Sequence, residues 1–283
     1  MWKIVLAMIA ISSLPLSSSV AEHDVQLAAV TSDSKNFFLT PIAIMRNGKL
    51  LKPVLYQRAN QQAIDRFVRL HYAQGTTMFL WQSGQARGKL RLGGLEPNCD
   101  SATTFHVTPI GETSFDKSRG AIALSQDIGP GHPNYVESAT EGERALFARV
   151  SQKALSESHT SITPKTPMKI HHLIRTRASA TGSPLLVGSI SFLQKKTEYW
   201  LFVILEQRDG EWRAAITKVH TVKDLEDRTD AQEEEYLDQL DIDGDGIDEI
   251  FTESNYYEAY SLAAYGLRGG VWNNIYESGV GGC

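Results

Sequence analysis

The sequence contains little cysteine. Of its 283 residues only Cys99 and the C-terminal Cys283 are cysteines, and neither belongs to a Cys-x-x-Cys motif. This spacing disfavours zinc binding and thiol redox chemistry. In an oxidising compartment a lone pair of cysteines tends to form a disulfide. We therefore expect a bridge between Cys99 and Cys283, which would stabilise the fold by closing a long loop. The alternative is a buried Cys99 and a free thiol at Cys283.

Familiar catalytic motifs are also missing. The chain has no Gly-x-Ser-x-Gly nucleophile elbow and no His-Glu-x-x-His zinc motif. Residues 84–89, GQARGK, are one residue too short for a phosphate-binding loop. His171 and His172 are adjacent, so on a regular strand they should point to opposite faces and would not easily bind one ion. These absences disfavour a serine hydrolase, a zinc metalloprotease or a nucleotide-binding enzyme of the kinds that such motifs identify.

Long apolar runs are absent after the first 21 residues, so no later segment reaches transmembrane length. The N-terminus reads MWKIVLAMIAISSLPLSSSVA. A lysine precedes an apolar stretch at residues 4–11, and small residues follow at the end of the segment. We expect residues 1–21 to be a signal peptide and Glu22 to begin a secreted or periplasmic chain. The alternative is a short membrane anchor.

The chain also lacks an excess of basic residues, since its net charge is −5. Residues 224–249 hold thirteen acidic residues and one basic residue, so this segment carries −12 and the remainder +7. Because a nucleic-acid partner needs a clustered basic face, we expect no nucleic-acid role. The concentrated acidity favours a cation instead.

Hydrophobic periodicity and turn residues predict an α+β fold with mainly antiparallel β sheets, two helices and a β-rich C-terminal region. Helices are expected over residues 60–75, with Asn60 as N-cap, and 138–158, with a capping box from Ser138 to Glu141. Strand segments are expected over residues 37–54 around an Asn47-Gly48 turn, 76–96, 103–110, 120–125, and from 168 onward.

Breaks in composition suggest how the chain is divided. The segment HTSITPKTP at residues 159–167 is rich in proline and threonine and indicates a linker. After the signal peptide at 1–21 we expect an N-terminal α+β region at 22–135, a helix and linker at 136–167, and a C-terminal β-rich domain at 168–283 that contains the acidic segment.

A weak internal similarity lies within the last of these regions. A shift of sixty residues aligns four pairs: Glu198 with Glu258, Arg208 with Arg268, Gly210 with Gly270, and Trp212 with Trp272. The pattern is either a repeat of one hairpin or a chance similarity of two turns.

The most informative stretch is LDIDGDGIDEIF, residues 240–251. Asp241, Asp243 and Asp245 occupy alternate positions, and the intervening glycines allow sharp turns. Hard divalent cations take oxygen ligands, and Ca²⁺ takes six to eight of them. Mg²⁺ fits less well because it demands octahedral geometry. The pattern predicts a Ca²⁺ site, and the alternative is a solvated acidic turn without a metal.

The residues that follow distinguish this loop from an EF-hand. An EF-hand needs a glutamate at position 12, which is Thr252 here, and helices on both sides. Glu249 stands at position 9 instead and begins a strand-like pattern. We expect the ligands to be the carboxylates of Asp241, Asp243, Asp245 and Glu249 and the carbonyl of Ile247, with Asp248 pointing outward or bridging through water.

A loop that ends in a strand and carries a carboxylate at position 9 resembles the calcium loops of FG-GAP and VCBS-type repeats, the blades of integrin-like β-propellers. The resemblance covers about residues 240–278. A complete propeller needs at least four blades, whereas one such loop occurs here. The resemblance implies a propeller-blade-like hairpin in which Ca²⁺ has a structural role.

Two hypotheses for function follow. The first is a secreted or periplasmic, calcium-stabilised, non-catalytic protein that binds a protein or glycan partner at the cell envelope. The second is a secreted hydrolase whose catalytic groups meet only in the fold. The missing motifs favour the first hypothesis. A Ser–His pair within hydrogen-bond reach would favour the second.

Overall fold

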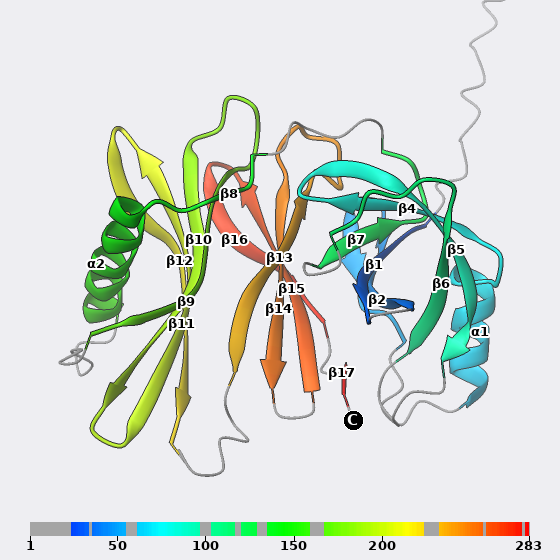
Figure 1. The fold of residues 1–283 in the computed structure, drawn as a ribbon, viewed down its shortest axis with the longest axis horizontal. Helices are drawn as coiled ribbons and strands as arrows, with labels where there is room; N and C mark the ends of the chain where they lie inside the picture. Colours follow the sequence, from blue (N-terminus) through cyan, green and yellow to red (C-terminus); the bar gives the residue numbers. More distant parts are fainter. Residues whose placement is uncertain are drawn as a thin grey trace, which may run out of the picture.

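The computed structural model describes residues 24–33, 36–54, 61–96, 103–116, 120–128, 135–158, 167–223, 232–256, 259–278 and 281–282. These residues form three antiparallel sheets and two helices (Figure 1). The expected α+β class with mainly antiparallel sheets is confirmed. In the described part of the chain, neither helix combines the length and hydropathy needed to cross a membrane.

The first sheet comes from the N-terminal part of the chain. Its strands are β1 (Val25–Ser32), β2 (Phe37–Arg46), β3 (Lys49–Leu51), β4 (Thr77–Gln82), β5 (Gln85–Glu96), β6 (Thr104–Ile110) and β7 (Ala121–Leu124). Their order is β1-β7-β4-β5-β6-β2-β3, and the sheet closes on itself because β1 also pairs with β2. Helix α1 (Gln61–His71) packs Phe67 into the core of this sheet, which confirms the first expected helix. Asn47 and Gly48 both have positive φ, as the hairpin prediction required.

The second sheet carries helix α2 on one face. Its strands are β8 (Glu137–Ser138), β9 (Lys169–Arg177), β10 (Pro184–Gln194), β11 (Thr197–Arg208) and β12 (Glu211–Val222), in the order β12-β11-β10-β9-β8. Helix α2 (Glu141–Ser158) buries Phe147 and Leu155 against this sheet. The helix is confirmed, but its capping box is not the predicted one. Thr140 caps it, because the Glu143 amide donates to the Thr140 hydroxyl and the Glu143 carboxylate accepts from the Thr140 amide.

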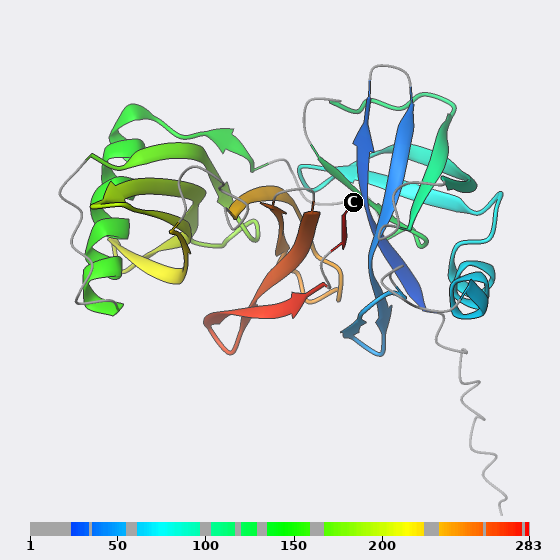
Figure 2. The same cartoon turned by 90° about the horizontal axis from the view of Figure 1, so that it is seen from below.

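The third sheet contains the acidic segment. Its strands are β13 (Glu233–Leu240), β14 (Glu249–Tyr256), β15 (Ala259–Arg268) and β16 (Val271–Glu277), with β17 (Gly281–Gly282) paired to β15. It lies between the other two sheets (Figures 1 and 2). On β14, Ile250 packs toward the second sheet and the next residue, Phe251, packs toward the first. Both faces of this sheet therefore pack against a neighbouring layer.

The sixty-residue similarity corresponds to equivalent strands. Strands β9 to β12 and β13 to β16 are two consecutive four-stranded meanders. Trp212 packs on the α2 side of the second sheet, and Trp272 packs on the side of the third sheet that faces the second. The two aligned tryptophans thus point in the same direction through the stack of layers. Glu258, one of the aligned residues, lies outside the described residues.

One local irregularity overturns a sequence prediction. The β9–β10 pairing matches Ser189 with His172 and Ile190 with Ile170, so His171 is an extra residue in β9, a β-bulge. His171 and His172 therefore do not point to opposite faces. Both contact β13 of the third sheet, His171 near Glu233 and His172 by stacking on Tyr236.

Several predictions concern residues outside the described part of the chain. These are the signal peptide at residues 1–21, the start at Glu22, the cap Asn60, most of the linker at 159–167, and both cysteines, Cys99 and Cys283. They stay predictions.

Candidate metal centre

The acidic loop, residues 241–248, joins β13 to β14, the first two strands of the third sheet. Gly244 and Gly246 have φ angles of 77° and 82°, values at which a residue with a Cβ atom would be strained. The aspartates alternate with these glycines. The chain can therefore turn tightly while every second side chain is available on the same side of the loop.

The loop's own amides donate hydrogen bonds to three of the carboxylates, including one of 3.3 Å from the Asp245 amide to Asp243. Asp241 accepts hydrogen bonds from the amides of Gly244, at 2.8 Å, and Gly246, at 2.9 Å. Asp245 accepts one from the amide of Ile247, also at 2.9 Å. Each carboxylate oxygen keeps a second lone pair, so these bonds leave the side chains able to bind a cation.

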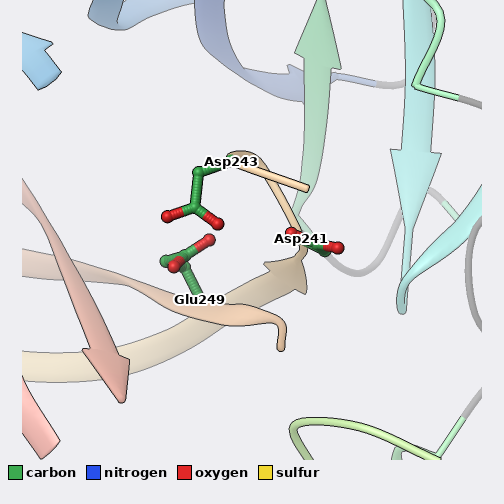
Figure 3. A group of neighbouring side chains, drawn as sticks. All are labelled: Asp241, Asp243 and Glu249. Carbon is green, nitrogen blue, oxygen red and sulfur yellow. The ribbon is translucent and has the colours of Figure 1, made fainter. Parts of the chain in front are cut away.

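Three of the predicted ligands meet in space. Oxygen atoms of Asp241, Asp243 and Glu249 all lie within 4.8 Å of one another, and the carboxylates of Asp243 and Glu249 face each other (Figure 3). Ca²⁺–oxygen bonds of 2.3–2.6 Å place any two ligands of one ion within about 5 Å of each other. The group therefore fits a Ca²⁺ ion. Asp245 is not part of it, and its carboxylate contacts Arg268 instead. Ile247 packs its side chain against the core between the second and third sheets.

Glu249 differs from the other members because it has no exposed surface. Its Oε2 atom accepts a hydrogen bond of 3.2 Å from the amide of Ile242. Burial, helped by the nearby Asp243, raises the pKa of Glu249 to about 7, although the Ile242 amide and Arg268 oppose the shift. A buried carboxylate of this kind needs a cation close by if it is to ionise without a large cost.

Arg268, on β15, supplies a positive charge at the loop. Its guanidinium lies 2.6 Å from Asp243, 3.2 Å from Asp245 and 2.7 Å from Glu249. In the sequence, Arg268 stands out only as the counterpart of Arg208, and no local pattern indicates its contact with the loop. Nineteen positions separate Arg268 from Glu249, and only the β14–β15 pairing brings them together.

Asp248 does not point outward, so the first of the two predicted alternatives for it is wrong, and the water bridge stays untested. It is 1% exposed and accepts a hydrogen bond of 2.8 Å from the Gln239 side-chain amide. Its own amide donates to the carbonyl of Ala178, which follows β9, at 2.6 Å. Gln239 also donates to the carbonyl of Arg177. Asp248 therefore fastens the acidic loop to the second sheet.

Comparisons with models of protein families, with curated protein sequences and with solved structures give no match to this chain. The geometry of the loop is therefore the basis for assigning it a ligand.

Proposed function

We propose that the acidic loop binds one Ca²⁺ ion and that the ion has a structural role. Its ligands are the carboxylates of Asp241, Asp243, Asp245 and Glu249 and the carbonyl of Ile247. The proposal rests chiefly on the convergence of the Asp241, Asp243 and Glu249 oxygens within 4.8 Å, with Glu249 fully buried. A divalent cation at this point would offset the repulsion among the carboxylates and allow Glu249 to ionise.

The position of the loop supports a structural role. It connects two strands of the central sheet, and Asp248 within it bonds to the second sheet. Fixing this turn would hold β14 in register between the layers on either side. The four-stranded meander β13 to β16 has the strand number of a propeller blade, which is in keeping with the FG-GAP and VCBS resemblance.

The proposed setting is the cell exterior or periplasm, where the calcium-stabilised domain binds a protein or glycan partner. Extracellular calcium modules typically bind with dissociation constants of about 10⁻⁴–10⁻³ M. A site of this affinity is filled wherever free calcium is in the millimolar range. Its natural role is therefore permanent stabilisation of a binding domain. Co-purification from the secreted or periplasmic fraction, compared between wild type and Asp243→Ala, would identify the partner.

Calorimetric titration of Ca²⁺ into chelator-treated protein tests the site. Wild type should give a saturable heat, and 10 mM Ca²⁺ should stabilise the fold by about 1.4–2.7 kcal/mol at the affinities above. Asp243→Ala should lose both effects. Asp65→Ala, which removes an exposed carboxylate from α1, is the matched control and should keep them. Equal heats for the two variants, or an unchanged melting temperature in Ca²⁺ and in chelator, would refute the proposal.

A further inference from the structure

The β-bulge in β9 has placed His171 beside a serine and a glutamate. His171 Nε2 lies 2.7 Å from the hydroxyl oxygen of Ser191 on β10. Its other ring nitrogen, Nδ1, lies 3.6 Å from Oε1 of Glu233 on β13. The three side chains thus form a line from serine through imidazole to carboxylate. Bulges are enriched next to active sites because they re-aim a side chain, as this one does.

The three residues differ in exposure along this line. The hydroxyl of Ser191 is sheltered, since the residue is 3% exposed, whereas the side chains of His171 and Glu233 are 14% and 35% exposed. The serine therefore lies at the inner end of the line and the carboxylate at its rim. The 2.7 Å distance between Ser191 and His171 matches a base placed to take the proton of a hydroxyl. The 3.6 Å distance from His171 to Glu233 is that of an ion pair and is longer than a hydrogen bond, so Glu233 would orient the ring by its charge or after a small approach.

We propose that Ser191, His171 and Glu233 form an acyl-transfer site that hydrolyses small carboxylic esters. Ser191 is the nucleophile, His171 the general base and acid, and Glu233 a positioning residue that holds the imidazole. This activity goes beyond calcium binding and does not depend on it. Glu233 begins β13 and the acidic loop follows its last residue, so about 23 Å of strand separates the two sites.

The chemistry balances without any cofactor. The Ser191 oxygen bonds to the ester carbonyl carbon while its proton moves to His171 Nε2. The bond from that carbon to the alkoxy oxygen then breaks, and the alcohol leaves with the proton from Nε2. A water molecule attacks the acyl-serine, giving its proton to His171, and the acid is released as Ser191 regains a proton. The sum is ester plus water to acid plus alcohol.

Trp200 lies next to Ser191 and His171 and carries a hydrogen-bond donor. It lies directly opposite Ser191 in the β10–β11 pairing, and its ring is 4.2 Å from the ring of His171. Its indole N–H is buried and has no hydrogen-bond partner among the described residues, so it is a donor available to the carbonyl oxygen as negative charge develops. Because Ser191 is only 3% exposed, a small acyl group such as acetyl would reach it more easily than a bulky one.

Covalent labelling tests the proposal. A fluorophosphonate probe reacts with a serine hydroxyl that a histidine activates, and mass spectrometry of the digested protein locates the label. We expect labelling at Ser191 in the full chain and none at that peptide in Ser191→Ala. Hydrolysis of p-nitrophenyl acetate should fall by roughly 10²-fold or more in Ser191→Ala and in His171→Gln. Ser189→Ala, two residues along the same strand and without the histidine contact, is the matched control and should keep label and rate.

The positioning role of Glu233 is tested by steady-state kinetics at several pH values. Glu233→Gln should lower kcat with KM nearly unchanged and shift the pH profile of kcat, and Glu233→Asp should restore part of the rate. Near-UV circular dichroism confirms that each variant is folded. A wild-type protein that takes no label at Ser191, or an ester hydrolysis rate equal in wild type and Ser191→Ala, would overturn the proposal. Either result would leave the calcium titration unaffected.

Discussion

Nη2 of Arg268 lies 2.7 Å from Oε1 of Glu249, a carboxylate with no exposed surface. The same nitrogen lies 2.6 Å from Oδ2 of Asp243. Both carboxylates belong to the proposed calcium site, so the guanidinium and Ca²⁺ would compete for the same two side chains. If the loop binds calcium as proposed, Arg268 would oppose the ion and would take its place when calcium is absent.

Replacing this arginine should separate its two effects. Arg268→Gln should bind Ca²⁺ roughly tenfold more tightly, or by about 1.4 kcal/mol, because the ion no longer displaces a cation. In chelator the variant should be less stable by about 1–2 kcal/mol, since Glu249 loses its ion pair while solvent partly screens Arg268. Calorimetry and urea denaturation measure the two quantities. Arg208→Gln, at the aligned position of the second sheet, should change neither the affinity for calcium nor the stabilisation that calcium gives. Unchanged or weaker calcium binding in Arg268→Gln would contradict the competition.

Asp238 should make stability depend on pH. It is 1% exposed and accepts hydrogen bonds from the backbone amides of Gln239, Ser83 and Gly84. Burial, with a smaller contribution from Asp248, raises the pKa of its carboxyl from 3.8 to about 7, although the three backbone hydrogen bonds lower it. The folded state therefore binds a proton more tightly than the unfolded state between about pH 4 and pH 7. Its contribution to stability falls as the pH rises through that window.

Asp238→Asn should remove the loss of stability at high pH, because an amide carries no charge. Its side-chain oxygen can still accept hydrogen bonds from the backbone amides. Measured in chelator by urea denaturation, the variant should match wild type near pH 4. At pH 8 it should be more stable by about 2–4 kcal/mol. Asp65→Asn on the exposed face of α1 should follow the wild-type curve. A variant that is less stable than wild type at pH 8 would show that the charge of Asp238 is compensated in the fold.

A buried ion pair joins the second and third sheets. The Glu234 carboxylate is 5% exposed and accepts hydrogen bonds of 2.7 Å from Thr252 and Tyr265. Lys218 on β12 approaches it to 3.0 Å. Lys218→Met should reduce the free energy of unfolding by roughly 3 kcal/mol, because it leaves a buried charge without its counter-ion. Chemical denaturation measures this loss.

A second substitution checks the origin of the effect. Adding Glu234→Gln to Lys218→Met should recover part of the loss, because the amide oxygen can still accept the two hydroxyl bonds without a charge. Lys196→Met, in the exposed turn between β10 and β11, should be nearly neutral. Additive losses from Lys218→Met and Glu234→Gln would show that the pair is not coupled.

The predicted disulfide between Cys99 and Cys283 is tested by peptide mapping without reductant. A bridged peptide pair should appear, and both thiols should resist alkylation until a reductant is added. Cys99→Ser, Cys283→Ser and the double variant should each lose a similar 2–5 kcal/mol, about the value of a native bridge, because either change breaks the same bond. Free alkylation of both cysteines in the untreated protein would disprove the bridge.

Turns and helices could be predicted from the sequence alone, because local patterns of residues specify them. The Asn47-Gly48, Asp209-Gly210 and Gly269-Gly270 pairs all have positive φ in the structure and all turn hairpins. Both helices formed where apolar spacing predicted them. These features depend on backbone preferences and on neighbours a few residues apart, which the sequence displays directly. The alternation of aspartate and glycine at residues 241–246 is of the same kind.

Contacts between distant segments were decided only by the tertiary structure. The bulge at His171, the burial of Asp248 against Ala178 and the reach of Arg268 to Glu249 each depend on how strands pair and sheets stack. One inserted residue reverses the face of a side chain, because side chains alternate along a strand. No local propensity signals such an insertion. The sequence therefore determined the turns, the helices and the acidic loop, whereas packing of the three sheets decided which charged and nucleophilic groups meet.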